Sequence, residues 1–215
     1  PDEGVSLIYQ HMGTRTLGDN LGLYLHYNFY FWKRRLQLRI GQGIAFNTNP
    51  YDPRDNFRNN AYGSDLMSST YLMFQSHREL IWNRLGIKAG ITLVHYSNAN
   101  VRAPNTSTNT LGLTAGLVYE LDSEPAGGYP YKRWPRTPVK EGVRLNLVFR
   151  SGINESDVVG SGQFPFYIFS AYADKRLGQL SAIHVGAEVF YSNFLKELIC
   201  FQSNSFPERN VAPDA

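Results

Sequence analysis

The segment NLGLYLHYNFYFW, residues 20–32, decides the fold class of this chain. Its odd-numbered positions carry only leucine, tyrosine and phenylalanine, whereas its even-numbered positions carry mostly polar or amphipathic side chains. Because successive side chains of a β-strand point to opposite faces, this period of two predicts a strand with one apolar face. The segment is too short for a membrane-spanning helix, which needs about 20 apolar residues.

The same alternation recurs along the chain and predicts an all-β, antiparallel protein of about nine strands. The clearest strands are expected at 20–32, 35–46, 85–93, 110–121, 143–150 and 183–191, and weaker ones near 5–12, 64–77 and 164–176. For the 64–77 stretch a helix is the alternative. The apolar face of residues 35–46 is interrupted by one polar side chain, Gln42.

The composition excludes several classes of protein. The 215 residues include 21 basic and 18 acidic side chains, and the resulting net charge of +3 is too small to predict nucleic-acid binding. The single cysteine, Cys200, excludes an internal disulfide framework. None of the five histidines lies in a metal-binding motif such as HExxH, so we expect no metal site.

Strands with one apolar and one polar face fit two architectures. In a soluble β-sandwich the apolar face would pack on a second sheet, whereas in a membrane barrel it would meet lipid and the polar face would line the lumen. The expected strands exceed the ~5–6 residues usual in globular proteins and reach the ~9–11 residues that a tilted strand needs to cross a bilayer. Aromatic residues near the strand ends are typical of membrane interfaces. We therefore predict an antiparallel transmembrane β-barrel.

The connections between the expected strands alternate in length, as in outer-membrane barrels. The short links 32–34, 78–83 and 177–180 are expected on the periplasmic side, and the longer loops 47–62, 98–108 and 153–163 on the extracellular side. The long 122–141 segment breaks this alternation. Because bacterial barrels have even strand numbers, we expect residues 1–215 to form a single barrel domain that ends in an extracellular loop and lacks its closing strands, with about 8 to 12 in the complete protein. A wrong strand count is the alternative.

The residues His95 and Ser97 interrupt the apolar face that residues 85–93 begin. Polar side chains on a lipid-facing wall are costly and tend to be functional. Their spacing places both side chains on one face, roughly 7 Å apart, where an imidazole can serve a serine nucleophile as general base. The alternative is that the strand has already left the bilayer and that both residues face water.

The sequence around this pair resembles a known family. The stretch HYSNA at 95–99, the Pro104-Asn105 pair and the strand from Thr110 are similar to the motif of the lipid A 3-O-deacylases of Gram-negative outer membranes, the PagL-like acyloxyacyl hydrolases. The resemblance implies a barrel that carries a serine esterase site on its outer wall. It also implies removal of an ester-linked acyl chain from lipid A, at the outer leaflet and without a cofactor.

The resemblance assigns roles to individual positions. It implies Ser97 as the nucleophile, His95 as the base, Asn105 in the oxyanion hole and Asn98 as a support of the loop. Where the family has a glutamate that orients the histidine, this chain has Asn109. An asparagine can accept a hydrogen bond from the imidazole, but it cannot stabilise an imidazolium by charge.

Two other functions stay open at this point. The chain can be a non-catalytic outer-membrane barrel, as a lipid-binding protein or a subunit of a larger outer-membrane complex, or it can be a small pore. The partners expected from the resemblance are lipopolysaccharide, through its lipid A, and outer-membrane lipids. A homodimer is a further expectation, and nucleic acid is not expected. The loop residue Arg102 is a candidate for contacting lipid A phosphates, because a guanidinium suits phosphate geometry.

Overall fold

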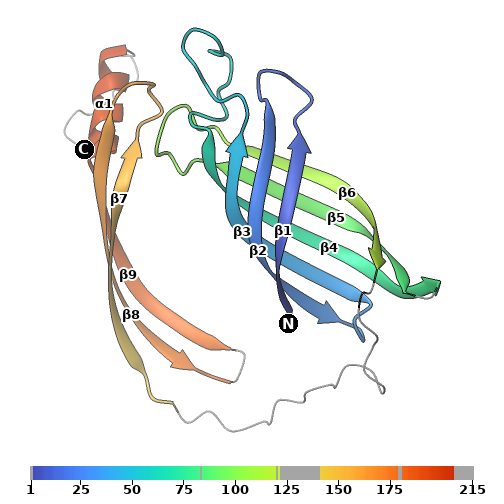
Figure 1. Cartoon of the computed structure of the whole chain (residues 1–215). Helices are drawn as coiled ribbons and strands as arrows, with labels where there is room; N and C mark the ends of the chain where they lie inside the picture. Colours follow the sequence, from blue (N-terminus) through green and yellow to red (C-terminus); the bar gives the residue numbers. More distant parts are fainter. Residues whose placement is uncertain (1, 83, 120, 122–140, 179–180, 206–215) are drawn as a thin grey trace. The chain divides into compact units, whose positions relative to one another are not determined.

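The computed structural model describes residues 2–82, 84–119, 121, 141–178 and 181–205. Within them, nine β-strands precede one helix (Figure 1). The strands are β1 (Asp2–His11), β2 (Asp19–Phe31), β3 (Leu36–Asn47), β4 (Leu66–Trp82), β5 (Leu85–Ser97), β6 (Thr108–Tyr119), β7 (Arg144–Glu155), β8 (Gln163–Arg176) and β9 (Ala182–Ser192), and the helix is α1 (Asn193–Ser205). All nine expected strands are present, and the doubtful 64–77 stretch is a strand.

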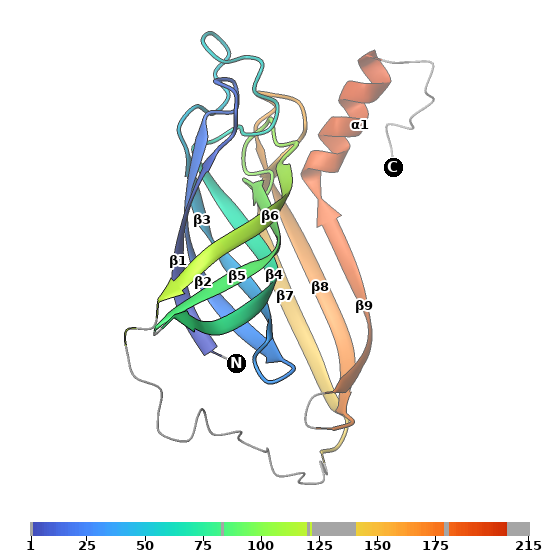
Figure 2. The ribbon, with the colours of Figure 1, turned by 90° about the vertical axis from the view of Figure 1, so that its right-hand side faces the viewer.

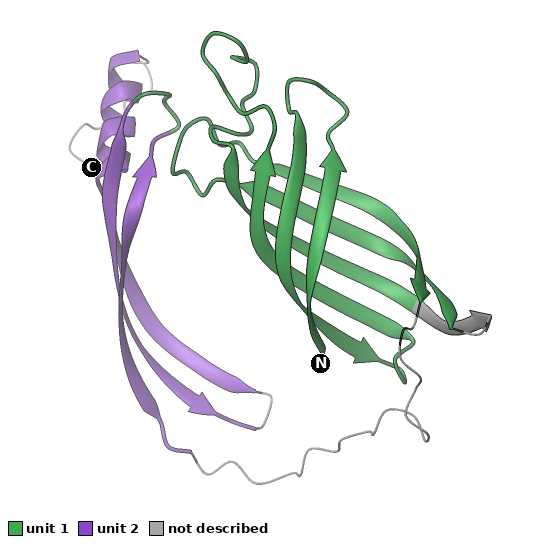
Figure 3. Cartoon of the chain, viewed as in Figure 1, with its two compact units in different colours: residues 1–123, 157–160 green, residues 124–156, 161–215 purple. Residues whose placement is uncertain are grey.

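The strands pair antiparallel in two sheets. Strands β1 to β6 form a six-stranded sheet in chain order, and β7 to β9 form a three-stranded sheet. The sheets belong to two compact units, residues 1–123 with 157–160 and residues 124–156 with 161–215 (Figure 3). The all-β antiparallel class is therefore confirmed, while a single domain over 1–215 stays a prediction. The six-stranded sheet curves strongly, as half of a barrel does (Figure 2). It carries His95, Ser97 and Asn109, and the other candidate site residues lie in the loop between β5 and β6.

The six-stranded sheet buries its polar side and exposes its apolar side. On β2, Tyr24 is 1% exposed and lies on the same side as the buried Asn20 and Asn28, whereas Leu25 on the opposite side is 71% exposed. A soluble sandwich would bury the leucine side against a second sheet. The observed arrangement is that of a barrel wall with lipid outside and polar side chains inside, so it favours the membrane barrel over the sandwich.

The buried side of this sheet is held by tyrosines and the hydroxyl groups around them. The rings of Tyr24 and Tyr71 meet edge to face with centroids 5.0 Å apart, and the Tyr24 hydroxyl lies 2.7 Å from Ser69 Oγ. Near the loop end, Gln10 Nε2 donates to Thr110 Oγ1 at 2.9 Å and connects the inner faces of β1 and β6. Buried polar groups are stable only when they are hydrogen-bonded, so these contacts fix the interior of the wall.

Two details of the sequence prediction are wrong. The link expected at 78–83 lies largely within β4, which continues to Trp82, because strand pairing does not require apolar side chains beyond the bilayer. Residues 193–205 form α1 where a loop was expected, and the spacing of Leu195, Leu198 and Ile199 is that of a helix. Residues 122–140 of the long connecting segment lie outside the described part. No helix among the described residues is long and apolar enough to cross a membrane.

Candidate functional site

The candidate site lies where β5 ends, on the exposed side of the six-stranded sheet. Val94 and Tyr96 are 7% and 0% exposed and face inward. His95 and Ser97 alternate with them on β5 and are half-buried on the opposite, outward side. The parity that was expected from the sequence is therefore confirmed, and the register of this strand is not shifted by one residue.

Asn109 lies directly beside His95. The two residues are register partners on β5 and β6, and His95 Nδ1 lies 2.8 Å from Asn109 Oδ1. Because an amide oxygen can only accept, the hydrogen bond requires the proton on Nδ1. The other ring nitrogen, Nε2, then carries a lone pair, which is the state that a general base needs. The contact predicted between Asn109 and His95 is thus present.

Ser97 is held by the loop that follows β5. Its Oγ accepts from Asn105 Nδ2 at 3.0 Å and from the backbone N–H of Ala99 at 3.1 Å. Its hydroxyl donates a longer bond, of 3.3 Å, to Asn105 Oδ1. Two N–H donors therefore converge on Ser97 Oγ and fix the position of the hydroxyl that would attack a substrate. The oxyanion of acyl transfer forms on the substrate's carbonyl oxygen, so these donors would stabilise it only by turning from Oγ to that neighbouring oxygen.

The loop itself, residues 98–107, is braced from within. The buried Asn98 donates from its backbone N–H to Asn105 Oδ1 at 3.1 Å and from Nδ2 to the Arg102 carbonyl at 2.6 Å. Asn105 Nδ2 also donates to Asn100 Oδ1 at 2.6 Å. Ala99 and Asn100 both have a φ of 57°, a left-handed conformation that non-glycine residues rarely adopt. Such conformations cost about 1–3 kcal/mol each and cluster at functional sites.

A second loop, residues 48–65 between β3 and β4, supports this one from beside it. The backbone N–H groups of Thr106 and Ser107 donate to the carbonyls of Asn60 and Ala61 at 3.0 and 3.3 Å. A Cβ added to Gly63 would lie 2.5 Å from the Arg102 carbonyl oxygen, so the two loops are in backbone contact there. The position of Asn105 therefore depends on the 48–65 loop.

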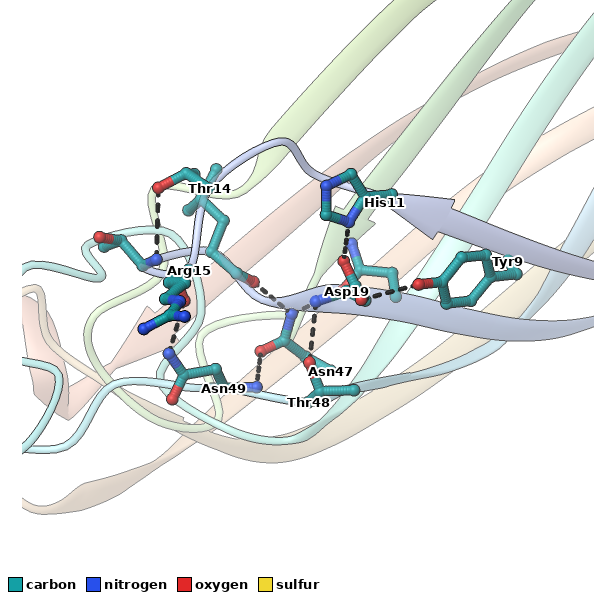
Figure 4. Close-up of polar contacts among 11 residues, drawn as sticks. Tyr9, His11, Thr14, Arg15, Asp19, Asn47, Thr48 and Asn49 are labelled. Carbon is teal, nitrogen blue, oxygen red and sulfur yellow. Dashed lines mark hydrogen bonds and ion pairs between the residues drawn. The ribbon is translucent and has the colours of Figure 1, made fainter.

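The 48–65 loop is anchored in turn to the β1–β2 connection (Figure 4). Thr48 Oγ1 accepts from the backbone N–H of Asp19 at 2.8 Å, and Asn49 Nδ2 donates to the Arg15 carbonyl at 2.6 Å. Asn47 Oδ1 accepts from the backbone N–H of Asn49 at 3.0 Å. Hydrogen bonds thus run through three loops from the first hairpin to the loop that holds Ser97.

The structure does not join every residue that the sequence singled out. Within the described residues, no hydrogen bond connects His95 to Ser97. Catalytic hydrogen bonds are often long or absent without substrate and form in the complex. Arg102 is exposed, and its contact with the site is made by its carbonyl rather than its guanidinium. Sequence reasoning named Ala99 only as part of the HYSNA motif and assigned no role to it or to Asn100, because a backbone donor and a left-handed conformation are not properties of a side chain.

Comparison with known protein families finds a match. A family model described as lipid A 3-O-deacylase (PagL) matches residues 1–118, which is more than half of the chain. The matched range contains His95, Ser97, Asn105 and Asn109. No curated protein and no solved structure matches the chain.

Proposed function

The chain belongs to the lipid A 3-O-deacylase (PagL) family, and on that premise we propose that it is an outer-membrane serine esterase that removes one ester-linked acyl chain from lipid A. The observation that carries the proposal is the pair of contacts on the outward side of β5: His95 Nδ1 bonded to Asn109 Oδ1 and Ser97 Oγ bonded to Asn105 Nδ2. Together they place a base, a nucleophile and an amide N–H donor beside the nucleophile on one exposed wall.

The chemistry follows the general scheme of serine esterases. Ser97 Oγ attacks the ester carbonyl carbon while its proton passes to His95 Nε2. The negative charge develops on the former carbonyl oxygen, which is bonded to the same carbon as Ser97 Oγ, and Asn105 Nδ2, which contacts Oγ before the attack, turns its N–H to that oxygen. The bond to the sugar oxygen then breaks, and that oxygen takes the proton from His95. Water attacks the acyl-serine in the same way, so that a free fatty acid leaves and Ser97 regains its proton.

The wall next to the site suits an acyl chain. Leu72, Leu93 and Leu111 pair in register across β4, β5 and β6, one row further from the loops than His95. Each is exposed, with Leu111 at 73%. An acyl chain that lies along this row contacts the leucines in place of a neighbouring lipid tail. The substrate can therefore be cleaved at the wall without leaving the membrane.

The same arrangement fixes the expected orientation. The site lies at the end of the sheet that carries the long loops, and in outer-membrane barrels the long loops are extracellular. We infer that Ser97 faces the outer leaflet, where lipid A is found. The exposed guanidinium of Arg102 is then available for a lipid A phosphate.

The alternative function is a barrel that binds lipid A without cleaving it. The observation that favours it is Asn109, because a neutral amide cannot stabilise the imidazolium that forms when Ser97 attacks. Such a protein would keep the fold and the binding surface and would lack turnover. A subunit role in a larger outer-membrane complex and a homodimer remain predictions.

A mass spectrum of lipid A separates these functions. Lipid A would be extracted from Gram-negative cells that express the parent chain, the Ser97→Ala variant, or a Ser76→Ala variant as a control on the same outward side of the sheet. We expect the parent and Ser76→Ala to yield lipid A that has lost one acyl chain, and Ser97→Ala to yield intact lipid A. Identical spectra from all three strains would support the non-catalytic alternative.

A further inference from the structure

The apolar outer wall contains a polar patch beside the candidate site. On β3 and β4, Gln42 Nε2 donates to Ser68 Oγ at 3.0 Å, and the Thr70 hydroxyl donates to Gln42 Oε1. All three side chains lie on the outward side of the sheet. We call Gln42, Ser68 and Thr70 the amide patch.

The register places the amide patch next to the site residues. Thr70 is the direct partner of Gln42 on one side and of His95 on the other, and His95 is the partner of Asn109. Four polar side chains on four adjacent strands thus form one row across the wall. Ser68 is likewise the partner of Ser97. Neighbouring strands are about 4.8 Å apart, so Gln42 lies about 10 Å from His95.

The amide patch is set within the apolar wall rather than at its watery rim. Ile40 and Ile44 flank Gln42 on β3 and are exposed, as is Leu25, its register partner on β2. Leu66 lies between Ser68 and the loop. Polar side chains that face lipid are costly, which makes them candidates for function. A leucine or isoleucine at position 42 would continue the apolar face without the cost of exposing a polar side chain to lipid.

The patch has hydrogen-bonding capacity left over. A glutamine amide carries two N–H donors and an oxygen with two lone pairs, and each hydroxyl is both donor and acceptor. Within the described residues, Gln42 Nε2 makes one hydrogen bond and the Ser68 hydroxyl accepts it without donating its own proton. At least one N–H and one O–H therefore remain for a ligand. These groups match the amide carbonyls and hydroxyls of an acylated amino sugar and have no counterpart to bind on a plain lipid tail.

We propose that the amide patch is a subsite for the acylated amino sugar of lipid A, which it holds by an amide or hydroxyl group while the ester reaches Ser97. The proposal rests on the proposed function for its choice of ligand. It assigns the polar part of the substrate to the β3–β4 side of the site and the acyl chain to the leucine row of β4, β5 and β6.

The test measures binding in a Ser97→Ala background, so that turnover does not interfere. Lipid A in detergent micelles is the ligand, and a phosphatidylglycerol with saturated chains is the comparison lipid. The variants are Ser97→Ala alone and combined with Gln42→Leu, with Thr70→Val, or with the control Ser76→Ala. Because Gln42→Leu removes one or two hydrogen bonds, it should weaken lipid A binding about 5- to 10-fold. The affinity for phosphatidylglycerol should stay unchanged. Ser76→Ala should change neither.

Two outcomes of the binding test overturn the subsite. If Gln42→Leu and Thr70→Val bind lipid A as tightly as their background, the patch serves only to satisfy its own polar groups. If lipid A and phosphatidylglycerol weaken equally, the patch is a structural part of the wall. Whether the parent chain cleaves lipid A tests the proposed function independently of the subsite. A parent that never cleaves lipid A, but binds it through Gln42, would end the esterase proposal and leave the subsite standing.

Discussion

The exchange of Asn109 for a carboxylate gives the sharpest prediction. Asn109→Asp keeps the shape of the side chain and the 2.8 Å contact between its oxygen and His95 Nδ1. Because that contact already sets the proton on Nδ1, the variant adds only the attraction between a carboxylate and the imidazolium that forms as Ser97 attacks. In Ser-His-Asp triads, exchange of the acid for an amide lowers the rate strongly because the histidine then adopts the wrong tautomer. In this chain Asn109 already selects the right tautomer, so the tautomer does not contribute to the difference.

The expected size follows from the surroundings. Two unit charges 4 Å apart attract by about 1 kcal/mol in water and about 4 kcal/mol at the effective dielectric of a protein surface. Asn109 is exposed and His95 is half-buried, so we expect the lower part of this range, about 1–2 kcal/mol. That lowers the barrier enough to raise kcat about 5- to 30-fold. Asn109→Glu, which restores the residue expected of the family, should change kcat in the same direction.

The assay is release of fatty acid from lipid A in detergent micelles, with kcat and KM determined separately. Asn109→Leu removes the acceptor and should lower kcat about 2- to 10-fold, the value of one neutral hydrogen bond. KM should stay similar in all variants, because the side-chain oxygen of Asn109 bonds to His95 and acts on the substrate through it. If Asn109→Asp is no faster than the parent while Ser97→Ala is inactive, another group orients His95 and the reasoning is refuted.

Three further predictions concern the loops. Asn105→Ala removes the amide that positions Ser97 Oγ and that, in the proposed mechanism, turns to the oxyanion, so it should lower kcat about 10²- to 10³-fold with little change in KM. Gly63→Ala forces a Cβ to within 2.6 Å of the Ala103 carbonyl oxygen, and the displacement of the loop should lower kcat roughly 10²-fold. The control Gly116→Ala, where a Cβ meets open space, should leave kcat unchanged. Equal rates for the two variants would contradict the loop contact. Asn59→Ala leaves the buried N–H groups of Ala61 and Tyr62 without their acceptor and should lower the free energy of unfolding by about 2 kcal/mol or more, seen as a lower thermal midpoint in detergent.

The sequence predicted the strands well because one rule controls them. A wall with lipid on one side and packed polar groups on the other requires alternation at every step. The alternation at 20–32 therefore predicts the bounds of β2 to within one residue. The odd positions of His95 and Ser97 likewise predict that both side chains lie on the outward side of the sheet. The rule weakens outside the bilayer. Polar residues at 78–79 resemble a turn, yet β4 continues through them, since backbone pairing is independent of side-chain polarity.

The candidate site could be predicted only in part. The residues His95, Ser97 and Asn109 follow from parity and from a short motif, and their register as neighbours follows from the length of the connecting loop. The backbone donor at Ala99 depends on left-handed residues, which nothing in an Ala-Asn pair specifies. The sequence identifies Gln42 as a polar residue that interrupts the apolar alternation. Its contact with Ser68 and Thr70 could not be predicted, because it depends on the register between β3 and β4, which a long loop leaves undetermined.

The central claim is that Ser97 is a nucleophile activated by His95 on the outer wall of the barrel. The most direct measurement is the mass of the purified protein, and of its peptides, after exposure to a fluorophosphonate that carries a long alkyl chain. We predict one phosphonyl group per chain, located on Ser97, formed slowly or not at all in His95→Ala and unchanged in the Ser76→Ala control. An unmodified Ser97, or one that reacts equally fast without His95, would contradict the account.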